Sequence, residues 1–141
     1  MFIDEAYNRS IILIKEVSML SEGTVFATLA VSDMEVAKEF YGGTLGLVEV
    51  DENPGGVTYT SGDGKLFVYQ SENAGTNEAT SASWEVDDAE AVVTTLAAKG
   101  ISFEHYDMPD VTREGDIHFM GPYKSAWFKD PDGNILNISS R

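Results

Sequence analysis

The chain of 141 residues contains no cysteine, so it has no disulfide framework, no thiolate nucleophile and no cysteine-based zinc site. It has only two histidines, and histidine is the commonest metal ligand in proteins. Lys and Arg number 9 against 24 Asp and Glu, which gives a formal net charge of −15. Because binding to phosphates needs clustered cations, this balance argues against nucleic acid and against an anionic membrane surface as partners. Neutral or cationic small ligands remain compatible with it.

The sequence also lacks a long apolar run near its start. Residues 1–20 contain one apolar burst, Ile11 to Ile14, with Asp4 and Glu5 ahead of it. A secretory signal needs a basic start and roughly 7–15 apolar residues, and a membrane-spanning helix needs about 20. We therefore expect neither of them and predict a cytoplasmic protein. Residues 1–20 are interpreted either as an N-terminal arm that packs on a partner subunit or as an extension ahead of a natural start at Met19.

The remainder is predicted to form one domain over residues 21–141, because 43% of the chain is hydrophobic and this length buries a core. Ser32 and Asp33 follow a β-rich run and are candidates for a helix N-cap. Apolar residues then recur at helical spacing until Gly42-Gly43, which end the helix. The first module, at about 24–70, has this helix after the first of four strands, which are predicted at 24–31, 47–51, 57–61 and 65–70.

The same order of elements repeats after a polar segment at 71–79. Asp87 and Asp88 cap a second helix, which closes at Lys99-Gly100. The segment 107–123 is polar and rich in Gly and Pro, so we predict a loop that borders a binding site. The second module, at about 80–139, has strands predicted at 80–86, 101–106, 124–129 and 134–139.

Three stretches of the chain resemble the vicinal oxygen chelate superfamily, which groups glyoxalases, bleomycin-resistance proteins, fosfomycin-resistance proteins and extradiol dioxygenases. They are VSDMEVAKEFYGGTLGL at 31–47, the helix and strand at 86–103, and FKDPDGNILNI at 128–138. The resemblance implies an α+β fold in which paired βαβββ modules form a cup-shaped sheet with helices outside. It also implies a homodimer, since many members build each site from two modules or two chains.

Members of this superfamily normally hold a divalent metal with His, Glu or Gln at four strand positions. The resemblance places these positions at Phe26, Val68, Ser81 and Asn137. Phe and Val side chains cannot coordinate a metal, and a hydroxyl and an amide are poor ligands for transition metals. Shifting the alignment by one residue brings no better ligand. We therefore predict no metal and no other cofactor.

The same positions predict which side chains point into the cup, because strand side chains alternate between faces. On the strand at 65–70 this assigns Leu66, Val68 and Gln70 to the cup, and Phe67 and Tyr69 to the helices. The inward set combines apolar walls, an aromatic platform and a few polar groups, which is typical of a small-molecule pocket. The predicted ligand-binding residues are Phe26, Thr28, Val68, Gln70, Ser81, Ser83, Glu85, Trp127 and Asn137.

Simpler interpretations stand beside this one. The apolar members of the set also suit a collapsed, filled cup, and Glu85 also suits an ordinary rim carboxylate. His118 and Tyr123, beside Met120-Gly121-Pro122, are candidates for a lid, although a single loop histidine is more often solvated. The aspartates around Pro131 are explained by turn chemistry alone.

Two functions are consistent with the sequence. The first is a metal-independent module that binds an aromatic or cationic compound, as in the bleomycin-resistance branch that the chain resembles. The second is a glyoxalase-like lyase or isomerase, or a dioxygenase, with an atypical or absent metal site. No G-x-S-x-G elbow and no phosphate-binding loop occurs in the chain, so no catalytic residue is predicted.

Overall fold

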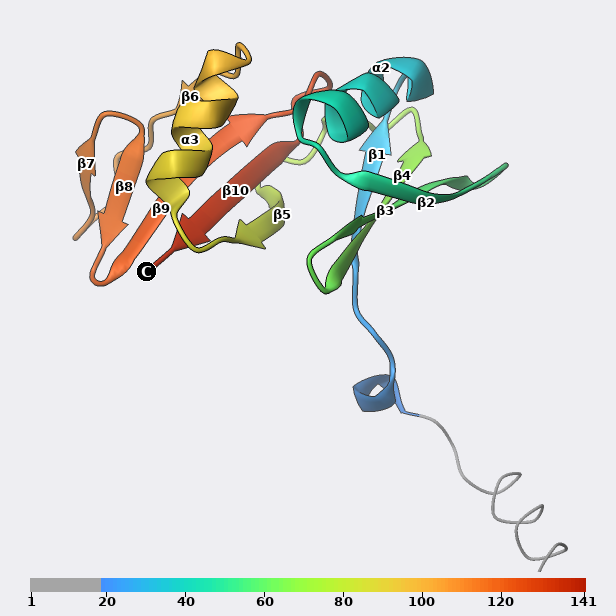
Figure 1. Ribbon diagram of the computed structural model, residues 1–141, viewed down its shortest axis with the longest axis horizontal. Coiled ribbons are helices and arrows are strands. Elements are labelled where there is room, and N and C mark those ends of the chain that lie inside the picture. Colours follow the sequence, from blue (N-terminus) through green and yellow to red (C-terminus); the bar gives the residue numbers. More distant parts are fainter. Residues whose placement is uncertain (1–18) are drawn as a thin grey trace, which may run out of the picture.

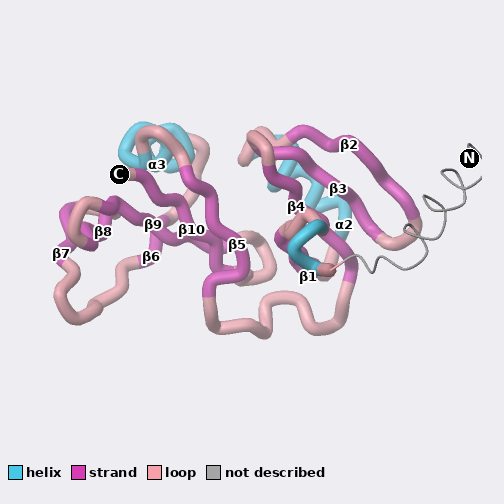
Figure 2. The backbone as a smooth tube through the Cα atoms, turned by 90° about the horizontal axis from the view of Figure 1, so that it is seen from below, coloured by secondary structure: helices cyan, strands magenta, loops and turns pink. Residues whose placement is uncertain are grey.

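The structure, a computed structural model, describes residues 19–141, so nearly all of the predicted N-terminal arm at residues 1–20 lies outside the described residues. Within this range the chain forms two open sheets, and a helical segment packs against each of them (Figure 1). A short 3₁₀ turn, η1 (Leu20–Glu22), precedes the first module. Figure 2 shows the two modules side by side, with the long loop from β4 to β5 joining them. The fold is therefore α+β with paired βαβββ modules.

The first sheet has the strand order β1-β4-β3-β2, in which β1 runs parallel to β4 and the other pairs are antiparallel. In β3 apolar and polar residues alternate, with Val57 and Tyr59 buried and the threonines that follow them less so, because one face of the sheet is buried and the other is not. The strands match the order predicted from the sequence. They are β1 (Ala27–Val31), β2 (Val48–Asn53), β3 (Gly56–Ser61) and β4 (Gly64–Gln70).

The helical segment of this module begins as the sequence predicts and ends later than predicted. The Asp33 carboxylate accepts hydrogen bonds from the backbone N–H groups of Glu35 and Val36, which caps α2 (Met34–Lys38). The chain then continues as a π-helical segment, η2 (Glu39–Thr44), through Gly42-Gly43. Its wider turn tolerates the two glycines because the backbone N–H of Leu45 still reaches the carbonyl of Phe40 at 2.9 Å.

The second sheet has the order β5-β10-β9-β8-β7, and β6 also pairs with β9. The helix α3 (Ala89–Ala98) is capped by the Asp88 carboxylate, which accepts from the backbone N–H of Ala91. The predicted loop at 107–123 was wrong in part, because it contains the hairpin of β7 and β8. The strands are β5 (Thr80–Glu85), β6 (Phe103–Glu104), β7 (Thr112–Glu114), β8 (Ile117–Met120), β9 (Tyr123–Lys129) and β10 (Ile135–Ser140).

One hydrophobic core is shared by the two modules. It includes Leu29 and Val68 from the first sheet, and Phe128 and Leu136 from the second. Tyr41 lies between them, fully buried, with its ring edge against Phe40. Because apolar side chains from both modules contribute to the same core, the modules are held together by burial as well as by hydrogen bonds. Among residues 19–141, no helix is long and apolar enough to cross a membrane.

Candidate ligand-binding site

The face of the second sheet that points away from α3 carries a row of polar and aromatic side chains. In the strand register, Asn137 on β10 pairs with Ser83 on β5 and with Trp127 on β9. Directly paired residues project from the same face, so these three side chains lie side by side across three strands. Ser139 forms a second row in the same way between Glu85 and Ser125. Four of the predicted site residues therefore share one surface: Ser83, Glu85, Trp127 and Asn137.

Two members of this surface are held in place by hydrogen bonds. The Asn137 amide Nδ2 donates to the backbone carbonyl of Ala126 at 3.2 Å, and the side chain is buried. The indole Nε1 of the half-buried Trp127 donates to Oγ1 of Thr80 at 3.2 Å. Ser83 and Glu85 are exposed. The arrangement is a fixed aromatic and amide platform beside two polar groups that are accessible to a ligand.

His118, predicted in the loop at 107–123, lies on β8 and is fully buried. Its register partner on β9 is Ser125, so it belongs to the same sheet face as Trp127. Its Nε2 accepts a 2.9 Å hydrogen bond from the backbone N–H of Tyr106, and its ring meets the Trp127 ring edge-on at 4.9 Å. The lid assignment was therefore wrong for His118, because the β7–β8 hairpin packs this side chain beneath the surface.

The sequence offered one signal for this burial. A Phe and an Ile flank His118, which is the alternating pattern of a strand, but the Gly and Pro residues around it favoured a loop. Tyr123, the other lid candidate, is the first residue of β9 and is exposed. Its hydroxyl accepts a hydrogen bond from Nη2 of Arg141 at 2.8 Å.

On the first sheet, the predicted face assignment was wrong for β4. Val68 pairs with Leu29 and both are buried in the core. The register instead pairs Phe67 with Thr28, and Phe67 stacks on Tyr69 with ring centroids 6.2 Å apart. Both faces of β4 carry apolar side chains, so alternation alone did not identify the buried face. Packing of the smaller aliphatic side chains against the helical layer decided which face is buried.

Three other predicted site residues, Phe26, Gln70 and Ser81, lie near or beyond the ends of their strands. Phe26 precedes β1 and is half exposed, and Gln70 ends β4 and is exposed. The Ser81 hydroxyl, near the start of β5, accepts a 3.4 Å hydrogen bond from the Asn77 amide. The structure thus does not bring these three side chains together with Trp127 and Asn137 into one enclosed pocket of the described chain.

The side chains at the family's metal positions do not fit a transition metal. With the corrected face assignment of β4, Phe67 takes the place of Val68 on the face opposite the core. A phenyl ring is no better a metal ligand than the Val68 side chain. The other positions supply only a phenyl ring, a neutral hydroxyl and a neutral amide, which are poor donors for a transition metal. Within residues 19–141, no three His, Cys, Asp or Glu side chains gather into a group that would hold a metal ion. No chemical step through a metal is therefore derived for this site.

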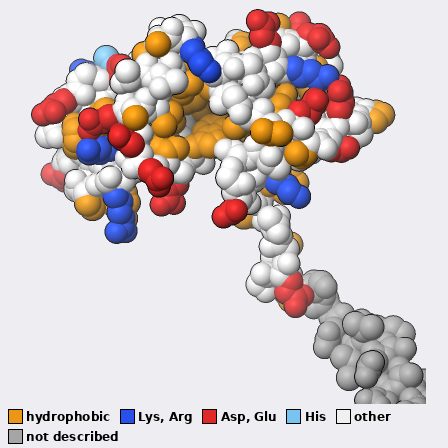
Figure 3. Space-filling model, viewed as in Figure 1, with side chains coloured by type: hydrophobic (Ala, Val, Ile, Leu, Met, Phe, Trp, Pro, Cys, Tyr) orange, Lys and Arg blue, Asp and Glu red, His pale blue; other side chains and the backbone are white. Residues whose placement is uncertain are grey.

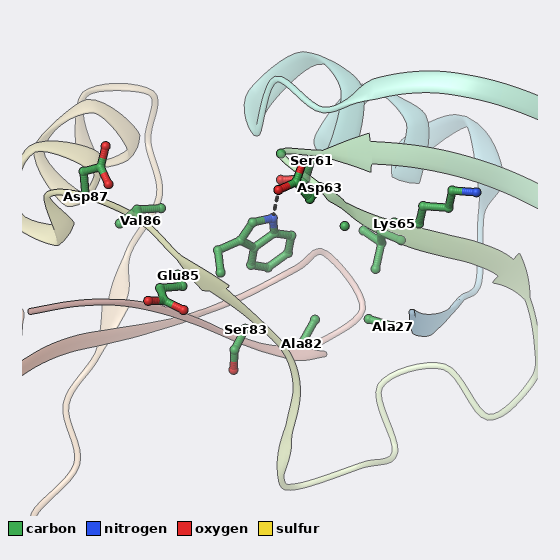
Figure 4. A pocket seen from close by; sticks show the side chains of 13 residues that line it. Ala27, Ser61, Asp63, Lys65, Ala82, Ser83, Glu85, Val86 and Asp87 are labelled. Carbon is green, nitrogen blue, oxygen red and sulfur yellow. Dashed lines mark hydrogen bonds between the residues drawn. The ribbon is translucent and has the colours of Figure 1, made fainter. Parts of the chain in front are cut away.

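A crevice of about 700 Å³ runs along the free edge of β5, between the two modules (Figure 4). Ser83 and Glu85 line it, and so does Trp84, whose indole Nε1 donates to Oγ of Ser61 at 3.1 Å. Trp84 was not among the residues predicted from the sequence to bind a ligand, and the crevice was not predicted either. It is formed by segments more than twenty residues apart in the chain, so no local pattern marks it.

The paired βαβββ modules, their open sheets and the outer helices define the class of the protein. Residues 23–138 match the model of the Glyoxalase/Bleomycin resistance protein/Dioxygenase superfamily, and the chain belongs to this superfamily. No curated protein matches the chain in sequence.

Solved structures with this fold come from several kinds of protein. A glyoxalase family protein from Enterococcus faecalis has a TM-score of 0.66 at 19% identity, covering 86% of this chain and 99% of its own. A lactoylglutathione lyase from Agrobacterium tumefaciens has a TM-score of 0.63 at 19% identity, covering 84% and 93%. A fosfomycin resistance protein from Mesorhizobium loti has a TM-score of 0.60 at 17% identity, covering 85% and 92%. At these identities the likeness concerns the fold alone.

Proposed function

We propose that this superfamily member is a metal-independent small-molecule-binding protein that holds an aromatic or cationic compound. The observation that carries the proposal is the row of Ser83, Asn137 and Trp127 across β5, β10 and β9. An aromatic ring with amide and hydroxyl groups beside it is the composition of a small-molecule site. The net charge of −15 and the exposed carboxylate of Glu85 favour a cation over an anion. The cytoplasmic location and the single domain over residues 21–141 belong to the same proposal.

The proposal includes a homodimer in which a second copy completes the cup. The exposed Val48 and Val50 on β2 support it, since β2 is the edge strand of the first sheet and such apolar edges tend to be covered. Phe26, directly before the edge strand β1, is a further exposed aromatic side chain. Sedimentation at tens of micromolar tests this part, and a monomer there would contradict it.

A metal-independent lyase or isomerase is the alternative, and His118 is the observation that favours it. Its Nδ1 is buried and has no hydrogen-bond partner in the described chain. Its Nε2 is already occupied by the Tyr106 N–H, however, and the ring is shielded from solvent. A general acid or base must reach the proton that it transfers, so binding is favoured over catalysis.

The experiment is a thermal-shift screen against cationic antibiotics, aromatic metabolites and divalent metals, followed by titration of the compounds that stabilise the protein. An aromatic contact contributes roughly 0.5–2 kcal/mol, so Trp127→Ala weakens binding about 2- to 30-fold. Trp127→Phe, which keeps an aromatic ring, is the matched variant and retains most of the affinity. Unchanged affinity in folded Trp127→Ala and Glu85→Gln variants would place the ligand outside this face. Turnover of a bound compound would favour the alternative function.

A further inference from the structure

A second cavity adjoins the crevice between the modules. It has a volume of about 210 Å³ and shares Ser61, Trp84 and Val86 with the crevice. The two cavities adjoin at these three residues, and we call them together the depression, with a polar part and an apolar part. Figure 3 shows hydrophobic side chains gathered in the hollow between the two lobes of the molecule. This depression opens along the edge of β5 and shares Ser83 and Glu85 with the sheet face around Trp127. Trp127 and Asn137 do not line it, and its interpretation does not rest on them.

The apolar part is built from both modules. Val92 and Leu96 come from α3 and Ile138 from β10, while Leu45 and Leu47 come from the segment between η2 and β2. Its lining contains one hydroxyl, that of Ser61, which is already bonded to Trp84. An apolar cavity of about 150 Å³ is enough to bind benzene, so this one admits a single ring or a short alkyl chain.

The polar part is acidic. Asp63 lies on the turn between β3 and β4, and Glu85 and Asp87 lie at the end of β5 on the opposite side (Figure 4). All three carboxylates are exposed at the rim. Lys65 is the one cation among the lining residues, and its ammonium group points away from Glu85 and Asp87. The potential at this rim, in a chain with net charge −15, is complementary to a cation.

Trp84 stands where the two parts meet. Its hydrogen bond to Ser61 joins the second module to the first and holds the indole ring in one orientation. The ring lines both cavities. An indole face attracts an organic ammonium group, and the same ring contacts an apolar substituent.

We propose that this depression binds a small organic cation with a short apolar tail. The ammonium group lies at the acidic rim formed by Asp63, Glu85 and Asp87, and the tail enters the cavity lined by Leu96 and Val92. Charge complementarity at one end and a volume suited to a short chain at the other identify this occupant.

The test uses octyltrimethylammonium as the probe, with tetramethylammonium and 1-octanol as its head and its tail alone. Calorimetric titration of the full chain at low salt is expected to give saturable binding at least about tenfold tighter for the probe than for either fragment. Raising the salt concentration is expected to weaken binding of the probe and to leave binding of 1-octanol unchanged, since only the charged head group is screened. Equal affinity for the probe and 1-octanol, or no saturable binding of the probe, would overturn the proposal.

Variants place the probe in the depression. The double variant Asp63→Asn/Asp87→Asn is expected to bind the probe about fivefold or more weakly at low salt. The matched control is Asp107→Asn/Asp110→Asn, which removes the same charge between β6 and β7 and leaves the affinity unchanged. Val92→Thr puts a hydroxyl into the apolar part with little change of volume. It is expected to weaken binding of both the probe and 1-octanol.

The remaining outcomes separate this site from others. Trp127→Ala leaves probe binding unchanged if the depression is the site; a loss of probe binding in that variant alone would assign the probe to the sheet face and overturn the proposal. Sedimentation of wild type and Val92→Thr gives the last check. A dimer that Val92→Thr dissociates and that excludes the probe would show that a second copy covers the groove, which also overturns it.

Discussion

The Tyr41 hydroxyl donates a 2.6 Å hydrogen bond to Oδ2 of Asp130, which joins the helical segment of the first module to the last turn of the second. Asp130 also accepts from the backbone N–H of Asn134 at 2.8 Å and from that of Asp132 at 3.0 Å. The Asn134 amide donates in turn to the carbonyl of Ala30 on β1 at 2.7 Å. The FY and DPDGN stretches, 89 residues apart at this contact, are thus two halves of one buried network.

Replacement of Tyr41 by Phe is expected to destabilise the protein. The change removes the hydrogen bond to a charged, buried acceptor and leaves the ring in the core, so we expect a loss of about 1.5–3 kcal/mol in the free energy of unfolding. Urea denaturation measures it. Tyr123→Phe is the control, because its exposed hydroxyl bonds only at the surface, and it changes stability by less than about 0.5 kcal/mol. An equal effect of the two variants would contradict the role given to Tyr41.

The same tyrosine makes stability depend on pH in the alkaline range. Burial, and then the negative charge of Asp130, raises the pKa of the Tyr41 hydroxyl far above its ordinary value of about 10. Above pH 10 the unfolded chain therefore releases a proton that the folded chain keeps. The contribution is fully present below pH 10 and declines by about 1.4 kcal/mol per pH unit above it.

Urea denaturation of wild type and Tyr41→Phe between pH 8 and 11 isolates this contribution. The stability advantage of the wild type is expected to be constant up to about pH 10 and to shrink above it. Other groups that titrate there, such as Tyr59, whose pKa burial also raises, are common to both proteins and cancel in the difference. An advantage that grows with pH would have the wrong sign for a buried neutral phenol.

The purified protein is expected to hold no stoichiometric transition metal. The sheet positions carry Phe26, Phe67, Ser81 and Asn137, which supply neither the charge nor the donor atoms that such a metal needs. Elemental analysis after purification without chelator measures the content. Close to one zinc, nickel or iron per chain that a chelator removes with loss of thermal stability would contradict the expectation.

Glu85→Gln is expected to weaken the binding of cationic ligands and not that of neutral ligands. The carboxylate is exposed on the sheet face and at the crevice rim, so it attracts a cation through solvent and its effect is largest at low salt. Titration of a cationic and a neutral ligand from the same screen separates charge from shape. Glu78→Gln, in the loop between the modules, removes an equal charge away from the site and serves as the control. Equal weakening of both ligands would indicate a structural effect of Glu85 instead.

Local chemistry in the sequence was enough for the order of the elements and for the family. Asp33 and Asp88 cap helices through side chains that reach backbone N–H groups two and three residues ahead, so their role is visible in a short window. The turn around Pro131 is likewise determined by its own residues, since Asp130 accepts from Asp132 and Asn134 within it. Strand alternation on β5, β9 and β10 also placed Ser83, Trp127 and Asn137 on one face, because the residues next to them, such as Ala82, Ala126 and Leu136, are apolar and buried on the other.

Tertiary structure decided what no short window contains. The two faces of β4 are both apolar, so only packing against the helical layer selected Val68 for the core and left Phe67 on the other side. His118 is buried because β8 pairs with β9. The Gly and Pro residues near His118 favour a loop and do not predict this pairing. The depression around Trp84 lies where the two modules meet, and residues of both modules line it. Turn and cap energies depend on neighbours in sequence, whereas burial and cavities depend on neighbours in space.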